Sequence, residues 1–521
     1  MKIFDTLYMS AQNQPDKIAA IHLENRISYG ELYKRSRLVA DYIGSLNLVN
    51  GARVGILFEN SVEYIYLYFA IFGAGYVPVP LDTSLKSERL AFILSDCGAS
   101  GLIIQGKFQK HLPMLLKLDT TIKEIITDNK IQSDFPGVNI GLIQNIIPVE
   151  NGNDAKLLES NANKLNHKDA SEELAAIFYT SGSTGAPKGV MLSHKNLLSN
   201  TYSTIEYLEL EADDSVMVIL PFYYIYGNSL LLTHVACGGT VVIDNRFMYP
   251  EIILKTMDKE KVTGFSGVPS NFMILLSKSS FPDKEFKHLR YFTQAGGSMA
   301  PEVIAKLKKA FPAKQIFIMY GQTEASPRVS YLPPAQLENK IGSIGIPIPG
   351  VEIKIMNEDG IEIPNGESGE LAVGGDNVML GYWNPEDEDS QVIRNGLLFT
   401  GDLAKKDDDG FIYIIGRKKE IIKSGGNRVS VKEIEDRILE HEQVIEVAVF
   451  GVADDILGEA IKAVIVPKEF CKLSDDEVRR FCRVKLAEFK IPKQIEFIDS
   501  LPKYQSGKID KAQLFKKNTK A

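Results

Sequence analysis

The sequence predicts an α/β protein with a large N-terminal domain of layered, mostly parallel sheets with helices, and a small α+β C-terminal domain. Three observations indicate this fold class. The chain has 521 residues, which exceeds the usual size of one domain. Strand-like apolar runs alternate with longer helical patterns through most of the chain. The composition changes near Gly416, so we expect domains at residues 1–416 and 417–521.

The alternation of apolar runs and helical patterns predicts the parallel sheets. A helical pattern at 302–310 is typical of the segments between the runs. Strands separated by such helices favour βαβ units, whose strands are parallel. The expected strands include residues 53–58, 102–104, 215–220 and 240–244.

Two capping boxes predict the helices of the C-terminal domain. Ser430 and Glu433 mark the start of one helix, and Ser474 and Glu477 mark the start of a second. We expect the second helix to extend to Leu486, and strands at 444–452 and 460–466. Short helices next to strands indicate a separate α+β unit.

Composition excludes several classes of protein. With 59 basic and 67 acidic residues the net charge is −8, which disfavours a nucleic-acid partner. The four cysteines form no C-x-x-C pair, so the sequence supports no zinc motif and favours a reducing, cytoplasmic location. The start of the chain lacks a signal-peptide pattern. The apolar run at 64–81 contains two glycines and two prolines, which favours a buried helix and strand over a transmembrane segment.

The strongest local motif is the loop at 179–189, YTSGSTGAPKG, which directly follows an apolar strand pattern. Its glycines permit a tight turn with inward-pointing backbone N–H groups, its hydroxyls add donors, and a lysine adds positive charge. These groups suit a polyphosphate, although Pro187 and Gly189 depart from the Walker A pattern. The candidate nucleotide-binding residues here are Thr180, Ser181, Gly182, Ser183, Thr184, Gly185 and Lys188.

Two further segments carry chemistry. Tyr320–Gly321–Gln–Thr323–Glu324 follows an apolar strand, and its carboxylate is the kind of hard oxygen ligand that Mg²⁺ prefers beside phosphates. A capped turn is the alternative for this segment. Asp402 can accept hydrogen bonds from both hydroxyls of a ribose, or can cap a helix or turn. The acidic run that begins at Asp407 is interpreted as a solvated turn.

The motif at 179–189 resembles the loop of the AMP-forming acyl-adenylate superfamily, which includes acyl-CoA synthetases, adenylation domains and luciferases. The resemblance extends over nearly the whole chain and is strongest to acyl-CoA synthetases. It implies that ATP, Mg²⁺ and a carboxylic acid react to give an acyl-adenylate. It also implies that the small domain is a mobile lid and that the acyl group passes to a thiol of CoA.

The resemblance assigns roles to individual residues. Tyr320 and the segment Gly296–Gly297–Ser298 lie beside adenine; Asp402 and Arg417 hold the ribose with Tyr413 nearby; Arg428 meets phosphate; and Thr184 and Glu324 serve the metal. Lys508 bridges the carboxylate and the α-phosphate, with Thr323 and Glu324 as its catalytic partners. Lys419 is the hinge, and Gly425 and Gly426 line the thiol tunnel after the lid rotates.

The expected acyl pocket is mainly apolar and comprises Tyr224, Tyr226, Phe265 and Val268, although several of these side chains suit a plain core equally well. Many acyl- and aryl-CoA synthetases carry His where this sequence has Tyr224. No Asp occurs between residues 221 and 232, which disfavours an amino-acid substrate and leaves a fatty or aryl acid. The sequence does not decide whether Arg328 meets a polar group or is structural.

Three functions are compatible with these motifs. The first is an acid–CoA ligase, and the second is a stand-alone adenylation enzyme that loads the phosphopantetheine of an acyl carrier protein. The third is a nucleotide-binding protein without catalysis. The joint presence of Lys188, Glu324, Asp402 and Lys508 disfavours the third.

Overall fold

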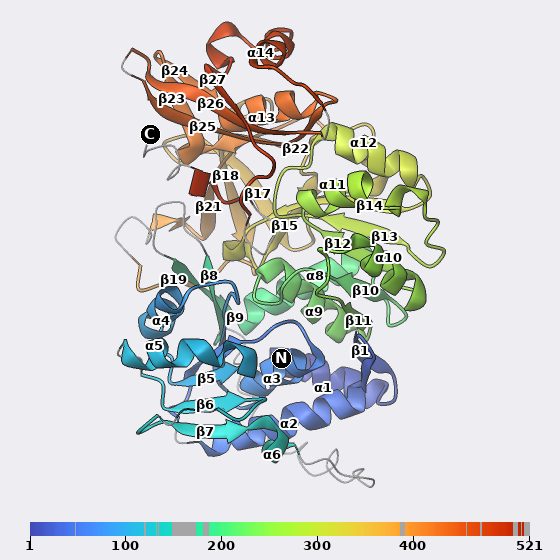
Figure 1. Ribbon diagram of the computed structural model, residues 1–521, viewed down its shortest axis with the longest axis vertical. Coiled ribbons are helices and arrows are strands. Elements are labelled where there is room, and N and C mark those ends of the chain that lie inside the picture. The colour runs from blue at the N-terminus through green and yellow to red at the C-terminus, as the bar shows by residue number, and fades with distance from the viewer. Residues whose placement is uncertain are drawn as a thin grey trace.

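The structure is a computed structural model that describes residues 1–46, 48–118, 121–131, 133, 135–147, 173–180, 187–385, 391–454, 456–468, 471–503, 509–511 and 513–514. Figure 1 shows a large lower body that contains the N-terminus and a smaller upper unit that begins at β23 (Ile421–Ser424). The mixed α/β fold class predicted from the sequence is confirmed.

The largest sheet has nine strands. Its central strands run parallel, whereas β2, β15 and β16 at the edges are antiparallel to their neighbours. In sheet order the strands are β16 (Ile346–Pro347), β15 (Arg328–Leu332), β14 (Gln315–Gly321), β13 (Tyr291–Gln294), β12 (Gly264–Gly267), β10 (Ser215–Val218), β11 (Thr240–Ile243), β1 (Ile18–His22) and β2 (Asn25–Ser28).

Helices cover both faces of this sheet, as expected of a mostly parallel sheet. One core packs against α1 (Ile3–Asn13), α8 (His194–Leu208) and α9 (Ile225–Cys237). A second core packs against α10 (Pro250–Lys259), α11 (Pro269–Lys278) and α12 (Pro301–Ala310), in agreement with the helix predicted at 302–310.

A second sheet of five parallel strands forms the bottom of Figure 1. The apolar run at 64–81 forms the buried helix α3 and then the buried strand β4, as predicted. A helix that is apolar on all sides is stable only when other elements surround it. The strands are β4 (Val77–Pro80), β3 (Arg53–Leu57), β5 (Gly101–Ile104), β6 (Glu124–Thr127) and β7 (Asn139–Leu142), and the nearby helices are α2 (Tyr29–Ser45), α3 (Val62–Gly73), α4 (Ser87–Asp96), α5 (Leu112–Lys117) and α6 (Ile143–Ile146).

Two smaller sheets lie between the parallel sheets and the upper unit. One is antiparallel, in the order β19 (Gly381–Trp383), β9 (Lys188–Ser193) and β8 (Leu174–Thr180). The other contains β17 (Val351–Met356), β18 (Ser368–Gly375), β21 (Leu397–Lys406), β20 (Ile393–Arg394) and β22 (Ile412–Arg417).

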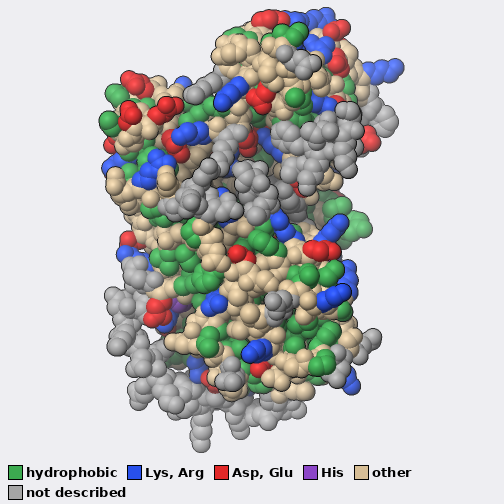
Figure 2. All heavy atoms as spheres, turned by 90° about the vertical axis from the view of Figure 1, so that its left-hand side faces the viewer, with side chains coloured by type: hydrophobic (Ala, Val, Ile, Leu, Met, Phe, Trp, Pro, Cys, Tyr) green, Lys and Arg blue, Asp and Glu red, His purple; other side chains and the backbone are tan. Residues whose placement is uncertain are grey.

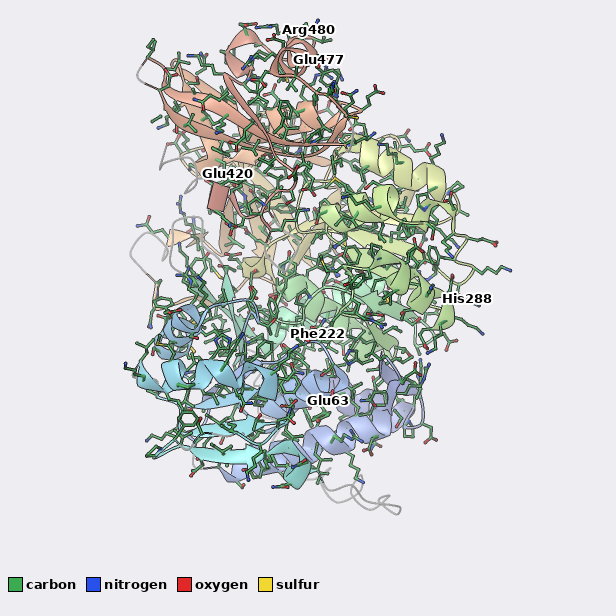
Figure 3. The ribbon with its side chains drawn as sticks, viewed as in Figure 1. Glu63, Phe222, His288, Glu420, Glu477 and Arg480 are labelled. Atoms are coloured by element: carbon green, nitrogen blue, oxygen red, sulfur yellow. The ribbon has the colours of Figure 1, made fainter. Side chains whose placement is uncertain are left out.

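The upper unit has its own sheet and its own apolar core, as a folding unit requires. In Figure 3, Glu420 lies at its foot, whereas Glu477 and Arg480 lie at its far end. The division at residue 416 stays a prediction. The unit contains β24 (Asn427–Ser430), β23, β26 (Gly458–Pro467), β25 (Val444–Asp454) and β27 (Gln494–Phe497), with helices α13 (Val431–Leu439) and α14 (Asp475–Arg483).

Both capping positions were predicted correctly, but the length of α14 was not. Ser430 accepts a hydrogen bond from the Glu433 backbone, and Ser474 forms a reciprocal capping box with Glu477. The helix α14 ends at Arg483, and Leu486 lies beyond it. The Leu486 N–H bonds to the Cys482 carbonyl, so a turn brings this leucine into the core without helical continuation.

Among the residues described, no helix combines the length and apolarity that crossing a bilayer requires. Basic and acidic side chains are interspersed over the face of the molecule shown in Figure 2.

Candidate active site

The predicted phosphate loop joins β8 and β9. Thr180, the last residue of β8, pairs directly with Lys188, the first residue of β9. The intervening candidates Ser181, Gly182, Ser183, Thr184 and Gly185 lie outside the described residues. The antiparallel ladder therefore brings the two ends of the loop together and fixes where the loop emerges from the sheet.

The end of this hairpin next to the loop is attached to the C-terminal end of α4. The Tyr179 hydroxyl donates to the Asp96 side chain. Burial raises the pKa of Tyr179, so the phenol keeps its proton at neutral pH. From β19, the Trp383 indole donates to the Asp96 carbonyl over 2.8 Å. Two strands of the same sheet, β8 and β19, therefore hold the start of the loop through Asp96.

Glu324 lies close to Lys188 through an intermediate tyrosine. The Tyr382 hydroxyl donates to Glu324 Oε1 over 2.8 Å. The Lys188 Nζ lies 5.5 Å from the centre of the Tyr382 ring, within the range of a cation–π contact. The Met379 N–H donates to the Glu324 carbonyl over 2.9 Å. Tyr382 thus contacts both Glu324, the carboxylate predicted to bind a metal, and Lys188, the lysine of the loop, which lie on different elements.

Asp402 has two charged or polar partners. Its Oδ2 accepts a hydrogen bond from the Tyr320 hydroxyl at 2.5 Å, and its Oδ1 lies 2.9 Å from Arg417 Nε. The carboxylate is 4% exposed, whereas the arginine is 56% exposed. Burial and the Asp402 charge raise the pKa of Tyr320, and the Asp402 carboxylate raises the pKa of Arg417. The phenol therefore stays protonated and donates a hydrogen bond to Asp402. Asp402 lies within a strand and caps no helix.

The segment after β14 forms one side of a small cavity. Gly321 pairs with Arg328 across the β14–β15 ladder, and a Cβ at Gly321 would lie only 1.9 Å from the Pro327 carbonyl oxygen. Only glycine permits this approach. Thr323 begins a short 3₁₀ helix at the cavity edge. The cavity measures about 30 Å³ and is lined by Tyr224, Ile225, Tyr226, Ala295, Gly296, Tyr320, Gly321, Gln322, Thr323, Pro327 and Arg328.

The Gly296–Ser298 segment follows β13 at the opposite wall. Gly296 lines the cavity, whereas Gly297 and Ser298 are exposed. The Gln294 side chain donates to the Gly297 carbonyl over 2.8 Å and so holds this loop beside the strand end.

The four predicted acyl-pocket residues separate into two pairs. Tyr224 and Tyr226 line the cavity. Phe265 is fully buried against Phe272 and Phe292, and Val268 is also buried; neither lines the cavity. For these two residues the geometry favours the core alternative, because the side chain of Phe265 packs with a phenylalanine cluster.

The acidic run at Asp407 forms a turn whose aspartates Asp408 and Asp409 are exposed, in agreement with the predicted solvated turn. Lys340 Nζ lies 2.8 Å from Asp407 Oδ2, and the Phe411 N–H donates to Asp407 Oδ1. Asp407 therefore closes the turn and pairs with Lys340. The Tyr413 hydroxyl donates to the same carboxylate over 3.5 Å, so Tyr413 contacts Asp407 in this structure.

The predicted lid residues are only partly within the described residues. Gly425 and Gly426 form the two-residue turn between β23 and β24, and both have positive φ, as the turn requires. The side chains of Lys419 and Arg428 and the whole of Lys508 lie outside the described residues. Lys418, next to the predicted hinge, lies 3.1 Å from Glu370 of β18.

Family models match most of the chain. Residues 7–383 match the AMP-binding enzyme family, and residues 433–508 match the AMP-binding enzyme C-terminal domain. The protein belongs to the AMP-binding enzyme family.

This AMP-binding enzyme is similar to CoA ligases over nearly their whole length. A long-chain-fatty-acid–CoA ligase of Salmonella typhimurium is 33% identical, over 97% of this chain and 92% of its own length. A feruloyl-CoA synthase of an Amycolatopsis species is 31% identical, over 97% of this chain and 96% of its own. The solved structure of O-succinylbenzoate coenzyme A synthetase from Bacillus subtilis with ATP and a magnesium ion has a TM-score of 0.82 and 28% identity, and covers 98% of this chain and 99% of that one.

The donor set of this AMP-binding enzyme fits a magnesium ion that arrives with its nucleotide. Within the described residues, no three His, Cys, Asp or Glu side chains gather to hold a metal. Glu324 is a single carboxylate, oriented by Tyr382. Mg²⁺ is commonly bound through one or two carboxylates together with substrate phosphates, so this sparse set is sufficient.

Sequence reasoning missed Tyr382. The residue is far from Glu324 in sequence and carries no charge, so only the pairing of β19 with β9 brings it to the site. The available signal was a glycine followed by two aromatic residues, Tyr382 and Trp383, in a short segment.

Proposed function

We propose that this enzyme is an AMP-forming acid–CoA ligase. A carboxylate oxygen of the acid attacks the α-phosphorus of ATP, and the bond to pyrophosphate breaks. The CoA thiol then attacks the acyl carbon of the acyl-adenylate, the bond to AMP breaks, and the thiol loses its proton. The observation that carries the proposal is the pairing of these motifs across the fold in a chain similar to CoA ligases over nearly its whole length. Tyr382 contacts both Lys188 and Glu324, and the cavity residue Tyr320 donates to Asp402.

Residues on the nucleotide side position and neutralise charge. Asp402, held by Tyr320 and Arg417, retains acceptor capacity because each carboxylate oxygen accepts more than one hydrogen bond, and so suits the ribose hydroxyls. Lys188 and the loop around it suit the polyphosphate. Glu324 would hold Mg²⁺ with Thr184, and the ion would offset phosphate charge when bound. Most of the rate enhancement is expected from such fixed charges.

Lys508 is proposed to join the two reacting anions. By resemblance it bridges the carboxylate and the α-phosphate, which otherwise repel each other. Removing one well-placed electrostatic donor typically raises a barrier by about 3 kcal/mol. The C-terminal unit carries this lysine, so the orientation of that unit sets when adenylation is possible.

Rotation of the C-terminal unit about Lys419 is proposed to exchange Lys508 for the Gly425–Gly426 turn. Lys418, with 55% of its side chain exposed, pairs with Glu370 of the N-terminal body. Exposed ion pairs contribute about 0–1 kcal/mol, so rotation can break this contact at little expense. Beyond the hinge, Lys511 lies 3.1 Å from Glu420 and 3.2 Å from Glu435. These contacts hold the start of the unit to its end, which supports its movement as one body.

CoA is the proposed acceptor. The curated relatives named above are CoA ligases, which favours CoA over the phosphopantetheine of an acyl carrier protein. The four free cysteines support a reducing, cytoplasmic setting for the enzyme.

The direct test measures pyrophosphate and AMP release with ATP, Mg²⁺ and a panel of acids. The expected result is acid-dependent pyrophosphate release, followed by AMP release and acyl-CoA formation once CoA is added. A phosphopantetheinylated carrier protein in place of CoA should give little product. Failure of every acid in the panel to release pyrophosphate would contradict the proposal.

A further inference from the structure

Arg328 is a buried cation with one unpaired edge. The residue is 2% exposed. Its Nη1 donates to Ser229 Oγ over 3.1 Å, whereas Nε and Nη2 are buried with no hydrogen-bond partner among the described residues. These two nitrogens form the side of the guanidinium that binds a carboxylate through two parallel hydrogen bonds. The edge of the guanidinium that can bind a carboxylate therefore has no partner among the residues that the structure describes.

The backbone around Arg328 is firmly held. Its carbonyl accepts hydrogen bonds from Asn200 over 2.7 Å and from Asn377 over 3.3 Å. Its guanidinium carbon lies 5.2 Å from the centre of the Tyr226 ring. In Figure 1, β15 lies near the centre of the molecule with α8 and α9 close to it. The guanidinium is thus positioned before any substrate binds.

No described carboxylate pairs with Arg328, and its neighbours are neutral. Burial raises the pKa of Tyr226 and the pKa of Tyr207, so both phenols keep their protons at pH 7. Burial lowers the pKa of His234 to about 4, so this imidazole is uncharged. Burying an unpaired charge is strongly unfavourable, and a charge of opposite sign from a ligand relieves it.

Arg328 lines the same cavity as the adenylation residues. Tyr320 and Thr323, which belong to the predicted nucleotide site, line it together with Tyr224 and Tyr226 of the predicted acyl pocket. A guanidinium in the wall of this cavity favours an acid with a second anionic end over a purely aliphatic chain.

We propose that Arg328 binds the second carboxylate of a short dicarboxylic acid whose first carboxylate is adenylated. The proposal rests on the proposed function and adds the substrate class. The two carboxylates of the acid would bind in different places. The reacting carboxylate would contact the nucleotide and Lys508, and the distal carboxylate would bind the Nε and Nη2 atoms of Arg328. An acid without the distal carboxylate leaves the buried arginine unpaired, and sites of this kind reject such analogues strongly.

The substrate test uses matched acids with the wild-type enzyme. Succinate, succinamate and butyrate have similar length, but succinamate has a neutral amide and butyrate a methyl group in place of the second carboxylate. Malonate and glutarate vary the spacing between the two carboxylates. We expect kcat/KM for one dicarboxylate to exceed that of its monocarboxylate and its monoamide by about 100-fold or more. Palmitate and ferulate represent the acids named in the relatives. Equal or faster reaction of palmitate, ferulate, butyrate or succinamate would overturn the proposal.

The variant Arg328→Met removes the charge at similar volume. For the preferred dicarboxylate we expect kcat/KM to fall by about 100-fold, while kcat/KM for butyrate holds or rises and KM for ATP is unchanged. If the role of Arg328 were purely structural, the substitution would lower kcat/KM for all acids to the same extent. Arg246→Met is the matched control, since Arg246 pairs with Asp244 and does not line the cavity. It should alter no acid preference.

Two outcomes separate the failures. If monocarboxylates release pyrophosphate as well as dicarboxylates do, the role of Arg328 is wrong and the ligase function stands. If no acid releases pyrophosphate, both proposals fail. Should Arg328→Met not fold, Arg328→Lys keeps the charge but loses the fork, and it should still weaken the dicarboxylate preference by about tenfold.

Discussion

The nucleotide side and the acyl side of the site differ in how many of their charged groups already have partners within the protein. On the nucleotide side, Asp402 already has Tyr320 and Arg417, and Glu324 has Tyr382. On the acyl side, two buried nitrogens of Arg328 have no partner in the part of the chain that the structure describes. The nucleotide side is therefore assembled in advance, whereas the acyl side is completed by its ligand.

This difference accords with what each side must recognise. ATP is common to the whole family, so its site can be built from fixed motifs. The acid varies between relatives, as the long-chain-fatty-acid and feruloyl enzymes show by name. Arg328 is thus the proposed residue that selects which acid this enzyme binds.

The largest effect is expected from Lys508→Ala, which removes a charge from the nucleotide side. Adenylation should fall by about 10²–10³-fold, because the two reacting anions lose their bridge. Thioester formation from presupplied acyl-adenylate should remain largely intact. Pyrophosphate release and acyl-CoA formation measured separately decide this, and an equal loss of both half-reactions would contradict the assigned role.

Asp402→Asn should weaken ATP binding through loss of a charged acceptor. Hydrogen bonds to charged groups contribute about 1.5–3 kcal/mol, so KM for ATP should rise by about 10–100-fold. Asp407→Asn is the control, because Asp407 pairs with Lys340 and closes a turn. Kinetics at saturating acid compare the two variants. Equal effects would remove Asp402 from the ribose site.

Acid should destabilise the N-terminal body through two buried histidines. Burial lowers the pKa of His194 to about 3 and of His234 to about 4, against about 6.5 in an unfolded chain. The unfolded state therefore binds more protons below pH 6.5. Stability is full above that pH and falls as pH drops toward the folded pKa values, by on the order of 2 kcal/mol per histidine at pH 5.

Denaturant unfolding at pH 7.5 and pH 5 measures this loss. His194→Asn should remove about half of the two-histidine effect, since asparagine can still accept the Ile3 N–H bond that His194 Nδ1 accepts. His288→Asn should change nothing, because Figure 3 shows His288 at the outer edge of the body. A pH slope unaffected by His194→Asn would show that other groups dominate.

The smallest effect is expected from Tyr382→Phe. The change removes one hydrogen bond to Glu324 and keeps the ring over which Lys188 lies. A single hydrogen bond contributes about 0.5–1.5 kcal/mol, so kcat should fall about 2- to 10-fold, with a higher Mg²⁺ requirement. Tyr249→Phe serves as the control, because Tyr249 is 67% exposed and does not line the cavity. A Mg²⁺ dependence identical to wild type would leave Tyr382 as a packing residue only.

Local patterns predicted much of this molecule. The alternation of strands and helices, the buried helix in 64–81 and both capping serines were all confirmed. Each depends on neighbours within a few residues of one another. The predicted end of α14 was wrong, because a turn after Arg483 places Leu486 in the core. The pairing of Asp407 with the distant Lys340 carried no local signal.

The sequence by itself predicted the motifs proposed to bind the nucleotide, because a phosphate loop, a carboxylate for a metal and a carboxylate for a ribose each need particular residue types, several of them close together in the chain. Only the tertiary structure decided the partnerships across the chain: Tyr382 with Glu324, Tyr320 with Asp402, and Phe265 with the core. It also decided that Arg328 is buried with an unpaired fork. Whether a charge is satisfied depends on everything packed around it, and residues distant in sequence supply that packing.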